Sequence, residues 1–250
     1  MFQCQFKIVE LCEGRIRVYE TEKDLVAGTF YIQHELKIIP MRYFVTSSET
    51  LLFSSRPYIY QLSFDTDTFN PVYTILCQLP KNLEGSSIFS LKDKFYLAFG
   101  MNSMCQLTSG EIFLIQNRKL KPFLNLEESR SFSGCCEFQN KIWFYGGIRV
   151  LSDTESLLND IITFDGQNIQ NTEIMGLPAC HSGQLCVLNA KLVCYGGKRN
   201  ITTVEEVRII NADNSYAFYN TSKDKFIICN NFILGPSYVK NDVINSEIVI

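Results

Sequence analysis

Short apolar runs joined by polar turns recur along most of the chain. SIFSLKDKFYLAFG at 87–100 and GCCEFQNKIWFYGG at 134–147 each contain two such runs, rich in aromatic and β-branched residues. Two polar residues separate the runs, which is typical of an antiparallel hairpin with a tight turn. No segment of comparable length keeps a 3.6-residue period, although 154–158 is compatible with a short turn of helix. The pattern therefore predicts an all-β fold.

These hairpins belong to a longer repeat. EFQNKIWFYGG at 137–147 and VLNAKLVCYGG at 187–197 place two Tyr-Gly-Gly triplets 50 residues apart. After each hairpin a variable loop leads to a third strand, such as NDIITFDG, and then to a fourth, such as IQNTEIMGLP. Each unit is therefore predicted to be a four-stranded antiparallel meander. The expected turns are Lys92-Asp93, Gln139-Asn140, Asn189-Ala190 and Asn230-Asn231, and the residues that follow or end the second strands are Ser54, Gly100, Gly146, Gly196 and Gly235.

The segment HSGQLCVLNAKLVCYGG, together with the third strands and the Leu-Pro pair before a following unit, resembles the kelch repeat. The resemblance covers 131–223 well and 41–130 and 224–250 in part. Only two units keep the double glycine, and the tryptophan usual after the third strand is missing. Kelch proteins fold as β-propellers, so the resemblance implies one blade per unit. The residues expected to maintain the repeat are Gly100, Tyr145, Gly146, Gly147, His181, Tyr195, Gly196, Gly197 and Gly235.

The repeat predicts one domain over 1–250, a β-propeller of six four-stranded antiparallel blades. The segment 224–250 supplies three strands, so Phe2–Leu11 is expected to add its outer strand and close the ring between the two ends of a complete domain. Glycines after the second strands are expected to let neighbouring backbones approach closely, so Gly146 should tolerate replacement less well than the loop residue Gly110. The approximate blades are 12–40, 41–80, 81–130, 131–179, 180–223, and 224–250 with 2–11.

Composition narrows the class of protein. Hydrophobic residues make up 46% and charged residues 20% of the chain, as in a folded globular domain. The formal charge of -3 gives no net attraction to nucleic acid or to an anionic membrane. No apolar stretch approaches the ~18 residues of a membrane span, and Glu10 and Glu13 interrupt the region that a signal peptide would need. We expect a soluble cytoplasmic protein whose ten cysteines stay reduced.

Groups suited to catalysis are few. His34 and His181 are the two histidines, and they fall in widely separated units. The best candidate metal cluster consists of Cys180, His181, Cys186 and Cys194. No C-x-x-C pair exists, however, and strand cysteines are more simply small buried hydrophobes. The sequence therefore predicts no catalytic residue, no metal site and no cofactor. A metal-dependent enzyme that uses the central channel of a propeller stays as an alternative.

Loops into the first strands and after the second strands are expected at one rim. This rim includes the two longest excursions, Met101–Gly110 and Ile148–Asn159, and the second of them holds exposed-looking Leu151, Leu157 and Leu158. The basic residues are either ordinary solvated charge or a site for an acidic or phosphorylated partner held by arginine contacts. The candidate partner-binding residues are Arg42, Arg56, Arg130, Arg149, Lys198, Arg199 and Leu157.

The repeat, the few catalytic groups and the basic rim together favour a non-enzymatic protein–protein interaction module. Such a propeller would act as a scaffold or an assembly subunit that binds another protein through its loop rim. The alternative is a substrate-recognition subunit of a ubiquitin ligase, as many kelch proteins are. Because 250 residues leave no room for a BTB or F-box domain, that role would need a separate adaptor.

Overall fold

In the computed structural model every regular element is a β-strand, and adjacent strands within each sheet are antiparallel. The all-β prediction is confirmed for the described residues. At Thr154–Leu157, where a turn of helix was compatible with the sequence, the chain forms a strand. The described part of the chain holds no helix with the length and apolarity of a membrane span. The described residues are 7–12, 15–20, 31–36, 42–45, 51–64, 71–80, 83–172, 174, 176–188, 191–195, 197–199, 202–203, 206–210, 216–220, 227–229 and 232–234.

Four sheets of four strands follow one another along the chain, each a meander. Sheet I contains β4 (Arg42–Val45), β5 (Leu51–Ser55), β6 (Tyr58–Phe64) and β7 (Pro71–Gln78). Sheet II contains β9 (Ser87–Leu91), β10 (Lys94–Ala98), β12 (Glu111–Gln116) and β13 (Lys119–Asn125). Sheet III contains β14 (Gly134–Phe138), β15 (Lys141–Tyr145), β18 (Ile161–Phe164) and β19 (Ile169–Thr172). Sheet IV contains β20 (Gln184–Leu188), β21 (Lys191–Tyr195), β24 (Glu206–Ile210) and β25 (Tyr216–Asn220).

A fifth large sheet, the terminal sheet, combines both ends of the chain, and three short ribbons lie between strands of the other sheets. The terminal sheet has the order β27-β26-β1-β2-β3. Its strands are β1 (Lys7–Cys12), β2 (Arg15–Glu20), β3 (Tyr31–Leu36), β26 (Ile227–Cys229) and β27 (Phe232–Leu234). The ribbons are β8 (Leu83–Glu84) with β11 (Met101–Asn102), β16 (Ile148–Leu151) with β17 (Thr154–Leu157), and β22 (Lys198–Arg199) with β23 (Thr202–Thr203).

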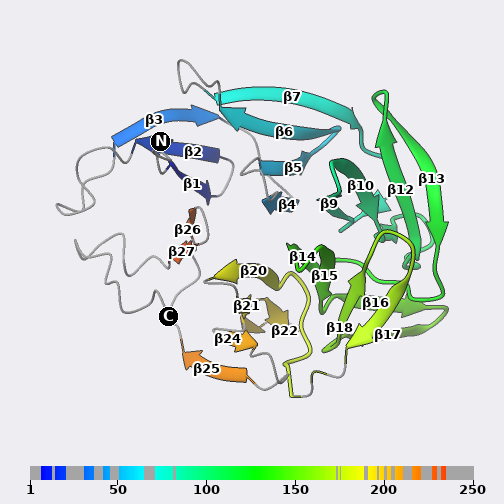
Figure 1. Ribbon diagram of the computed structural model, residues 1–250. Helices are drawn as coiled ribbons and strands as arrows, with labels where there is room; N and C mark the ends of the chain where they lie inside the picture. Colours follow the sequence, from blue (N-terminus) through cyan, green and yellow to red (C-terminus); the bar gives the residue numbers. More distant parts are fainter. Residues whose placement is uncertain are drawn as a thin grey trace.

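The sheets lie side by side in chain order. Figure 1 shows β4, β9, β14 and β20, the first strand of each meander, nearest the middle of the molecule. Neighbouring first strands contact one another, β4 with β9, β9 with β14, and β14 with β20. The outer strands β7, β13 and β25 lie at the periphery of the view. Sheets II and III therefore each pack against the sheets before and after them.

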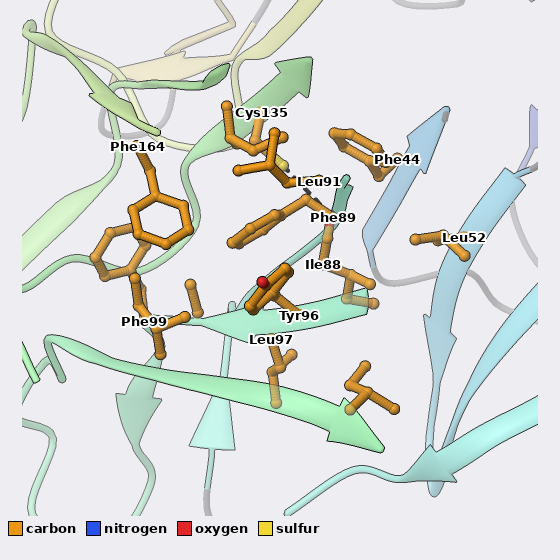
Figure 2. Packing of buried hydrophobic residues seen from close by; sticks show 14 of the residues in the cluster. Phe44, Leu52, Ile88, Phe89, Leu91, Tyr96, Leu97, Phe99, Cys135 and Phe164 are labelled. Carbon is orange, nitrogen blue, oxygen red and sulfur yellow. Dashed lines mark hydrogen bonds between the residues drawn. The ribbon is translucent and has the colours of Figure 1, made fainter. Parts of the chain in front are cut away.

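Aromatic rings fill the space between sheets I, II and III. Phe89 stacks on Tyr96 with ring centroids 5.2 Å apart and meets Phe144 and Phe164 edge-on at 5.4 and 6.0 Å. Figure 2 shows this cluster, with side chains arriving from β4, β5, β9, β10, β14 and β18. The short aromatic runs of the sequence thus form the contacts between sheets, where each ring buries a large apolar area.

The hairpin predictions hold where the chain is described. Lys92 and Asp93 have φ of 51° and 59°, and Gln139 and Asn140 have φ of 53° and 58°. Two successive residues in the left-handed region make the turn whose twist matches that of the flanking strands. The turns expected at 189–190 and 230–231 lie outside the described residues.

The repeat register inferred from the sequence is wrong by one residue in sheet II. Gly100, with φ of 110°, matches Gly147 at 110° and Gly197 at 109°, whereas Phe99, with φ of 63°, matches Gly146 at 61°. A phenylalanine thus takes the left-handed position that a glycine takes in the next unit. Phe99 is fully buried and its ring lies 5.0 Å from that of Phe144, so packing offsets the backbone cost of ~1–2 kcal/mol.

Ser54, the predicted landmark of sheet I, differs as well. Ser54 lies inside β5, paired with Arg42 and Ile59, because the turn of sheet I comes later, at Arg56-Pro57. Gly196 and Gly235 lie outside the described residues.

The two ends of the chain pair, but not at the predicted place. Strand β1 lies beside β26 with Ile8 opposite Cys229 and Val9 opposite Ile228. The sequence placed the N-terminal strand at the outer edge of the last blade and gave 12–40 a sheet of its own. In the structure β1–β3 and β26–β27 share one sheet. Among the described residues β26 and β27 are three residues long, and the longer β1 covers the edge of β26.

Candidate functional site: the two ends of the sheets

Sheets II and III present two different ends to solvent. Ser87 Oγ lies 3.0 Å from Ser133 Oγ, and Cys135 Sγ contacts the Ile88 carbonyl at 3.5 Å, so β9 and β14 run in the same direction. One end of both sheets, the excursion end, holds the long connections 99–110 and 146–160. The other, the turn end, holds the tight turns 92–93, 117–118, 139–140 and 165–168. Predicted partner-binding residues all belong to the excursion end.

Backbone hydrogen bonds join successive sheets at the excursion end. The Gly100 N–H donates to the Arg130 carbonyl at 2.8 Å, and in the next unit the Gly147 N–H donates to the Cys180 carbonyl at 2.7 Å. A Cβ at Gly146 would lie 2.5 Å from the Cys180 oxygen. Neighbouring backbones therefore approach closely at Gly146.

Two further residues of the repeat also have structural roles. The Tyr145 hydroxyl donates to the Pro178 carbonyl at 2.9 Å, and the ring is buried. His181 Nδ1 lies 3.1 Å from Ser182 Oγ, and its backbone bridges to Lys198. Gly197 keeps the positive φ of the repeat, and Tyr195 ends β21.

Arg130 is not a rim residue, and its predicted contact with a partner is wrong. Its side chain is fully buried, and its guanidinium donates to both carboxylate oxygens of Asp160 at 3.2 and 3.0 Å. It also donates to the Gly146 carbonyl at 3.3 Å and lies 5.8 Å from the centre of the Phe99 ring. Burial lowers the pKa of Arg130, and the Asp160 charge opposes that shift. Arg130 therefore ties sheet II to sheet III.

Two other predicted arginines are at the surface but paired. Arg56 donates to Glu84 at 2.9 Å, and Arg149 pairs with Glu128 and donates to the Ser129 carbonyl at 3.1 Å. Each carboxylate comes from a segment more than 20 residues away. A paired guanidinium has less charge and fewer donors available for a partner.

The remaining basic candidates do not complete a basic patch. Lys198 and Arg199 form β22 and are exposed, whereas Arg42 begins β4 and its side chain lies outside the described part of the chain. Among described residues at the excursion end, acidic side chains outnumber basic ones. The acidic set is Glu84, Glu111, Glu127, Glu128, Asp153, Glu155 and Asp160, and the basic set is Arg56, Arg130, Arg149, Lys198 and Arg199.

The two predicted excursions form one surface. The Thr108 N–H donates to the Val150 carbonyl at 3.1 Å, and the Val150 N–H donates back to Thr108 Oγ1 at 3.1 Å. These bonds fix the connection 101–109 of sheet II against the β16–β17 ribbon of sheet III. We call the two segments, 101–109 and 148–157, the platform. Their lengths are visible in the sequence, but the contact between them is not.

Apolar side chains are exposed on the platform. Met104 is 86% exposed, Leu151 52% and Leu107 38%. Leu157, the predicted contact residue, is only half-buried rather than exposed, because it lies in β17 opposite Ile148, and Leu158 is buried. Of the three leucines suggested by the sequence, Leu151 at the tip of the ribbon is the exposed one.

The turn end carries the basic character that the sequence assigned to the other end. Its charged residues lie next to the tight turns, and the basic ones outnumber the acidic ones. None of its basic residues forms an ion pair within the described part of the chain. The basic set is Lys92, Lys94, Arg118, Lys119, Lys121 and Lys141, and the acidic set is Asp93, Glu137 and Asp165.

The described residues do not form a metal-binding site. No group of three His, Cys, Asp or Glu side chains there is placed to hold a metal ion. Cys180 and Cys194, two members of the candidate cluster, are buried thiols. The side chains of Cys186 and His34 lie outside the described part of the chain.

Comparisons with known proteins give a likeness of fold. No family model matches the chain, and no curated protein matches it. Among solved structures, the chain is similar to the structure of YjhT, with a TM-score of 0.56 and 12% sequence identity. The match covers 75% of this chain and 68% of YjhT. At this identity the similarity concerns the arrangement of the backbone alone.

Proposed function

We propose that the chain is a kelch-like β-propeller that acts as a non-enzymatic protein–protein interaction module, a scaffold or assembly subunit. The larger sheets are its blades, and the platform is the surface that binds a partner protein. The charges of the platform's surroundings do not select the partner; its exposed apolar side chains do.

Two observations support the propeller. Successive sheets repeat the same joint, with Gly100, Gly147 and Gly197 in nearly identical backbone conformations. The first strands of the meanders lie together in the middle of Figure 1, and β1 pairs with β26 across the two ends of the chain. Such an arrangement leaves few exposed sheet edges, which is the physical advantage of a propeller.

The platform is the observation that carries the binding function. Loops on a rigid scaffold are where binding residues usually lie, and here hydrogen bonds between Thr108 and Val150 hold two loops from adjacent sheets together. A methionine exposed to 86% of its area has no role in the core, and flexible methionine side chains adapt well to a partner's apolar surface. Met104 and Leu151 are therefore the expected contact residues.

The experiment compares two sets of exposed apolar residues. Tagged protein is used to recover partners from an extract of the source cell, and these are quantified by mass spectrometry. Met104→Asp with Leu151→Asp should reduce recovery of the specific partner by about tenfold or more, because it removes two apolar contacts and buries charge. The matched control is Ile75→Asp on β7, 42% exposed and distant from the platform. Equal recovery by the platform variant and the control would contradict the proposal.

A further inference from the structure

The lysines of the turn end converge on the junction between sheets II and III. Lys94 precedes Phe95, which pairs with Ile115, and Gln116 follows Ile115 and pairs with Lys119. These residues therefore lie in one row across three strands at the end of sheet II. Lys121 joins the row, because its Nζ donates to Gln116 Oε1 at 2.8 Å. All three lysines are exposed.

The side chains of this row lie on the face of sheet II that is turned toward sheet III. Tyr96 and Phe123 both contact the Phe164 ring of sheet III, at 6.1 and 6.5 Å between centroids. Side chains two residues apart on a strand share a face, so Lys94 lies on the face of Tyr96 and Lys121 on that of Phe123. The lysines extend the interface between the two sheets to its solvent-exposed end.

Two more amines reach the same junction. Lys92 Nζ donates to the Asp165 carbonyl oxygen at 3.3 Å, which connects the turn of sheet II to that of sheet III. Lys141 Nζ, at the start of β15, lies 3.4 Å from Gln170 Oε1. Both amines are thus bonded to neutral oxygens. The junction gathers five ammonium groups without an ion pair among the described residues.

The carboxylate of Asp165, in the turn that Lys92 contacts, does not neutralise this group. Asp165 Oδ1 accepts hydrogen bonds from the backbone N–H groups of Gln167 and Asn168, each at 2.8 Å. It therefore stabilises its own turn and offsets the charge of Lys141 only in part. Adjacent strands lie about 4.8 Å apart, so Lys94 and Lys119, two strands apart, are roughly 10 Å from each other, about one Debye length at 0.1 M salt. The positive potentials of these amines add.

We infer that the turn end of sheets II and III, through Lys92, Lys94, Lys119, Lys121 and Lys141, binds an acidic, Asp- and Glu-rich segment of a partner protein. This surface lies opposite the platform and does not depend on it. Lysine ammonium groups act as hydrated point charges that attract anions without a fixed geometry, which suits a flexible run of carboxylates, whereas bidentate recognition of a single anionic group uses the planar fork of arginine. The turn end has one described arginine, Arg118.

Charge also argues against a longer polyanion. The whole chain carries a formal charge of -3, and the excursion end is acidic among its described residues, so a nucleic acid wrapped around the molecule would meet repulsion. The exposed residues in and beside the tight turns, 92–94, 116–119, 139–140 and 167–168, are Lys, Arg, Asp, Asn and Gln, and the exposed ring of Phe123 further along β13 packs edge-on against Phe164. The turns themselves therefore offer no aromatic ring on which a base could stack. A short acidic peptide can occupy the junction alone.

Binding of a fluorescent decaglutamate peptide tests this inference, with decaglutamine as the neutral control peptide. The parent protein should bind decaglutamate only, and more weakly as salt rises from about 50 to 150 mM. Lys94→Glu with Lys119→Glu and Lys121→Glu should weaken binding by about tenfold or more, since three exposed attractions become repulsions. The milder variant, with glutamine at the same three positions, should have an affinity for decaglutamate between those of the parent and the glutamate variant. The matched control, Lys198→Glu with Arg199→Glu at the excursion end, should keep the parent affinity.

Several results would overturn the inference. The first is absence of decaglutamate binding, and the second is an equal loss of affinity in the turn-end and excursion-end variants. Preference for a phosphoserine peptide, for phosphatidylserine vesicles or for single-stranded RNA over decaglutamate would also refute it. Because the peptide assay does not involve Met104 or Leu151, its outcome is separate from that of the partner-recovery experiment on the platform.

Discussion

Removing the carboxylate of Asp160 should destabilise the protein more than removing any surface charge. The substitution Asp160→Asn leaves the fully buried Arg130 cation without its counter-charge, although the carbonyl of Gly146 and the ring of Phe99 remain near it. Loss of one partner from a buried ion pair costs roughly 3–5 kcal/mol of unfolding free energy. The Asp160 side chain is 23% exposed, so water partly relieves the site and we expect about 3 kcal/mol.

The reverse substitution should cost less. Arg130→Met removes the buried charge and keeps much of the side-chain volume, while the remaining Asp160 carboxylate is reached by water. We expect a loss of about 1–2 kcal/mol, part of it from the lost contact with Phe99. The double variant should resemble Arg130→Met alone, which gives a coupling energy of about 3 kcal/mol, the whole cost of Asp160→Asn.

Urea unfolding of the four proteins in this cycle provides the assay. The matched control is Arg56→Met, which removes one member of the exposed pair with Glu84 and should change stability by about 1 kcal/mol at most. If Asp160→Asn unfolds within about 0.5 kcal/mol of the parent, or if the two substitutions add without coupling, Arg130 does not tie the sheets as described.

Two further predictions concern the backbone and a buried thiol. Gly147→Ala should destabilise the protein by about 2 kcal/mol or more in urea unfolding, because the new Cβ would lie 2.6 Å from the Ser131 oxygen. The control Gly166→Ala has a similarly positive φ but no atom within 3.4 Å of the new Cβ, so it should cost about 1 kcal/mol. Equal losses in the two variants would refute the steric argument. Burial raises the pKa of Cys77 to about 11 from an ordinary 9.0, so its contribution to stability is present below pH 9 and is lost as pH rises through 11. The parent should therefore lose unfolding free energy between pH 8 and pH 10.5, and Cys77→Ala should lose less. Cys105→Ala, at an exposed site, should lose as much as the parent.

The strand pattern was predictable because it depends on local chemistry. Alternating apolar runs and two-residue polar turns locate β9–β10 and β14–β15 almost to the residue. The one-residue error in the predicted repeat register at Phe99 has a non-local cause. Glycine is the usual signal for a left-handed residue, but at Phe99 the ring packs against Phe144 and Arg130, which come from other segments.

Gly110 shows the same limit from the opposite side. The sequence suggests an ordinary loop glycine that tolerates replacement, yet a Cβ there would lie 2.1 Å from the Leu126 carbonyl oxygen. Close approach of a segment 16 residues away leaves no mark at Gly110 itself. Its substitution is therefore expected to be as harmful as that of the repeat glycines.

The charge distribution was the least predictable feature. An arginine in a loop was assumed to be exposed, but Arg130 meets a carboxylate 30 residues further along the chain, and Arg56 meets one 28 residues away. Such pairs form only when the sheets come together. The lysines of the turn end are not visible as a group in the sequence because they are spread over separate hairpins, and only the register of sheet II places Lys94, Lys119 and Lys121 together.

The proposed propeller requires a ring of sheets, which the pairing of β1 with β26 would close. The most direct test introduces one additional cysteine by the substitution Ile8→Cys, because residue 8 lies opposite the native Cys229. Directly opposed residues on antiparallel strands have the Cα separation that a disulfide needs. Mild oxidation followed by peptide mapping should give an intramolecular disulfide between positions 8 and 229. The control Val9→Cys lies on the other face of β1 and should not form a disulfide with Cys229. Absence of the 8–229 link in monomeric, folded Ile8→Cys would contradict the pairing, and with it the closed ring.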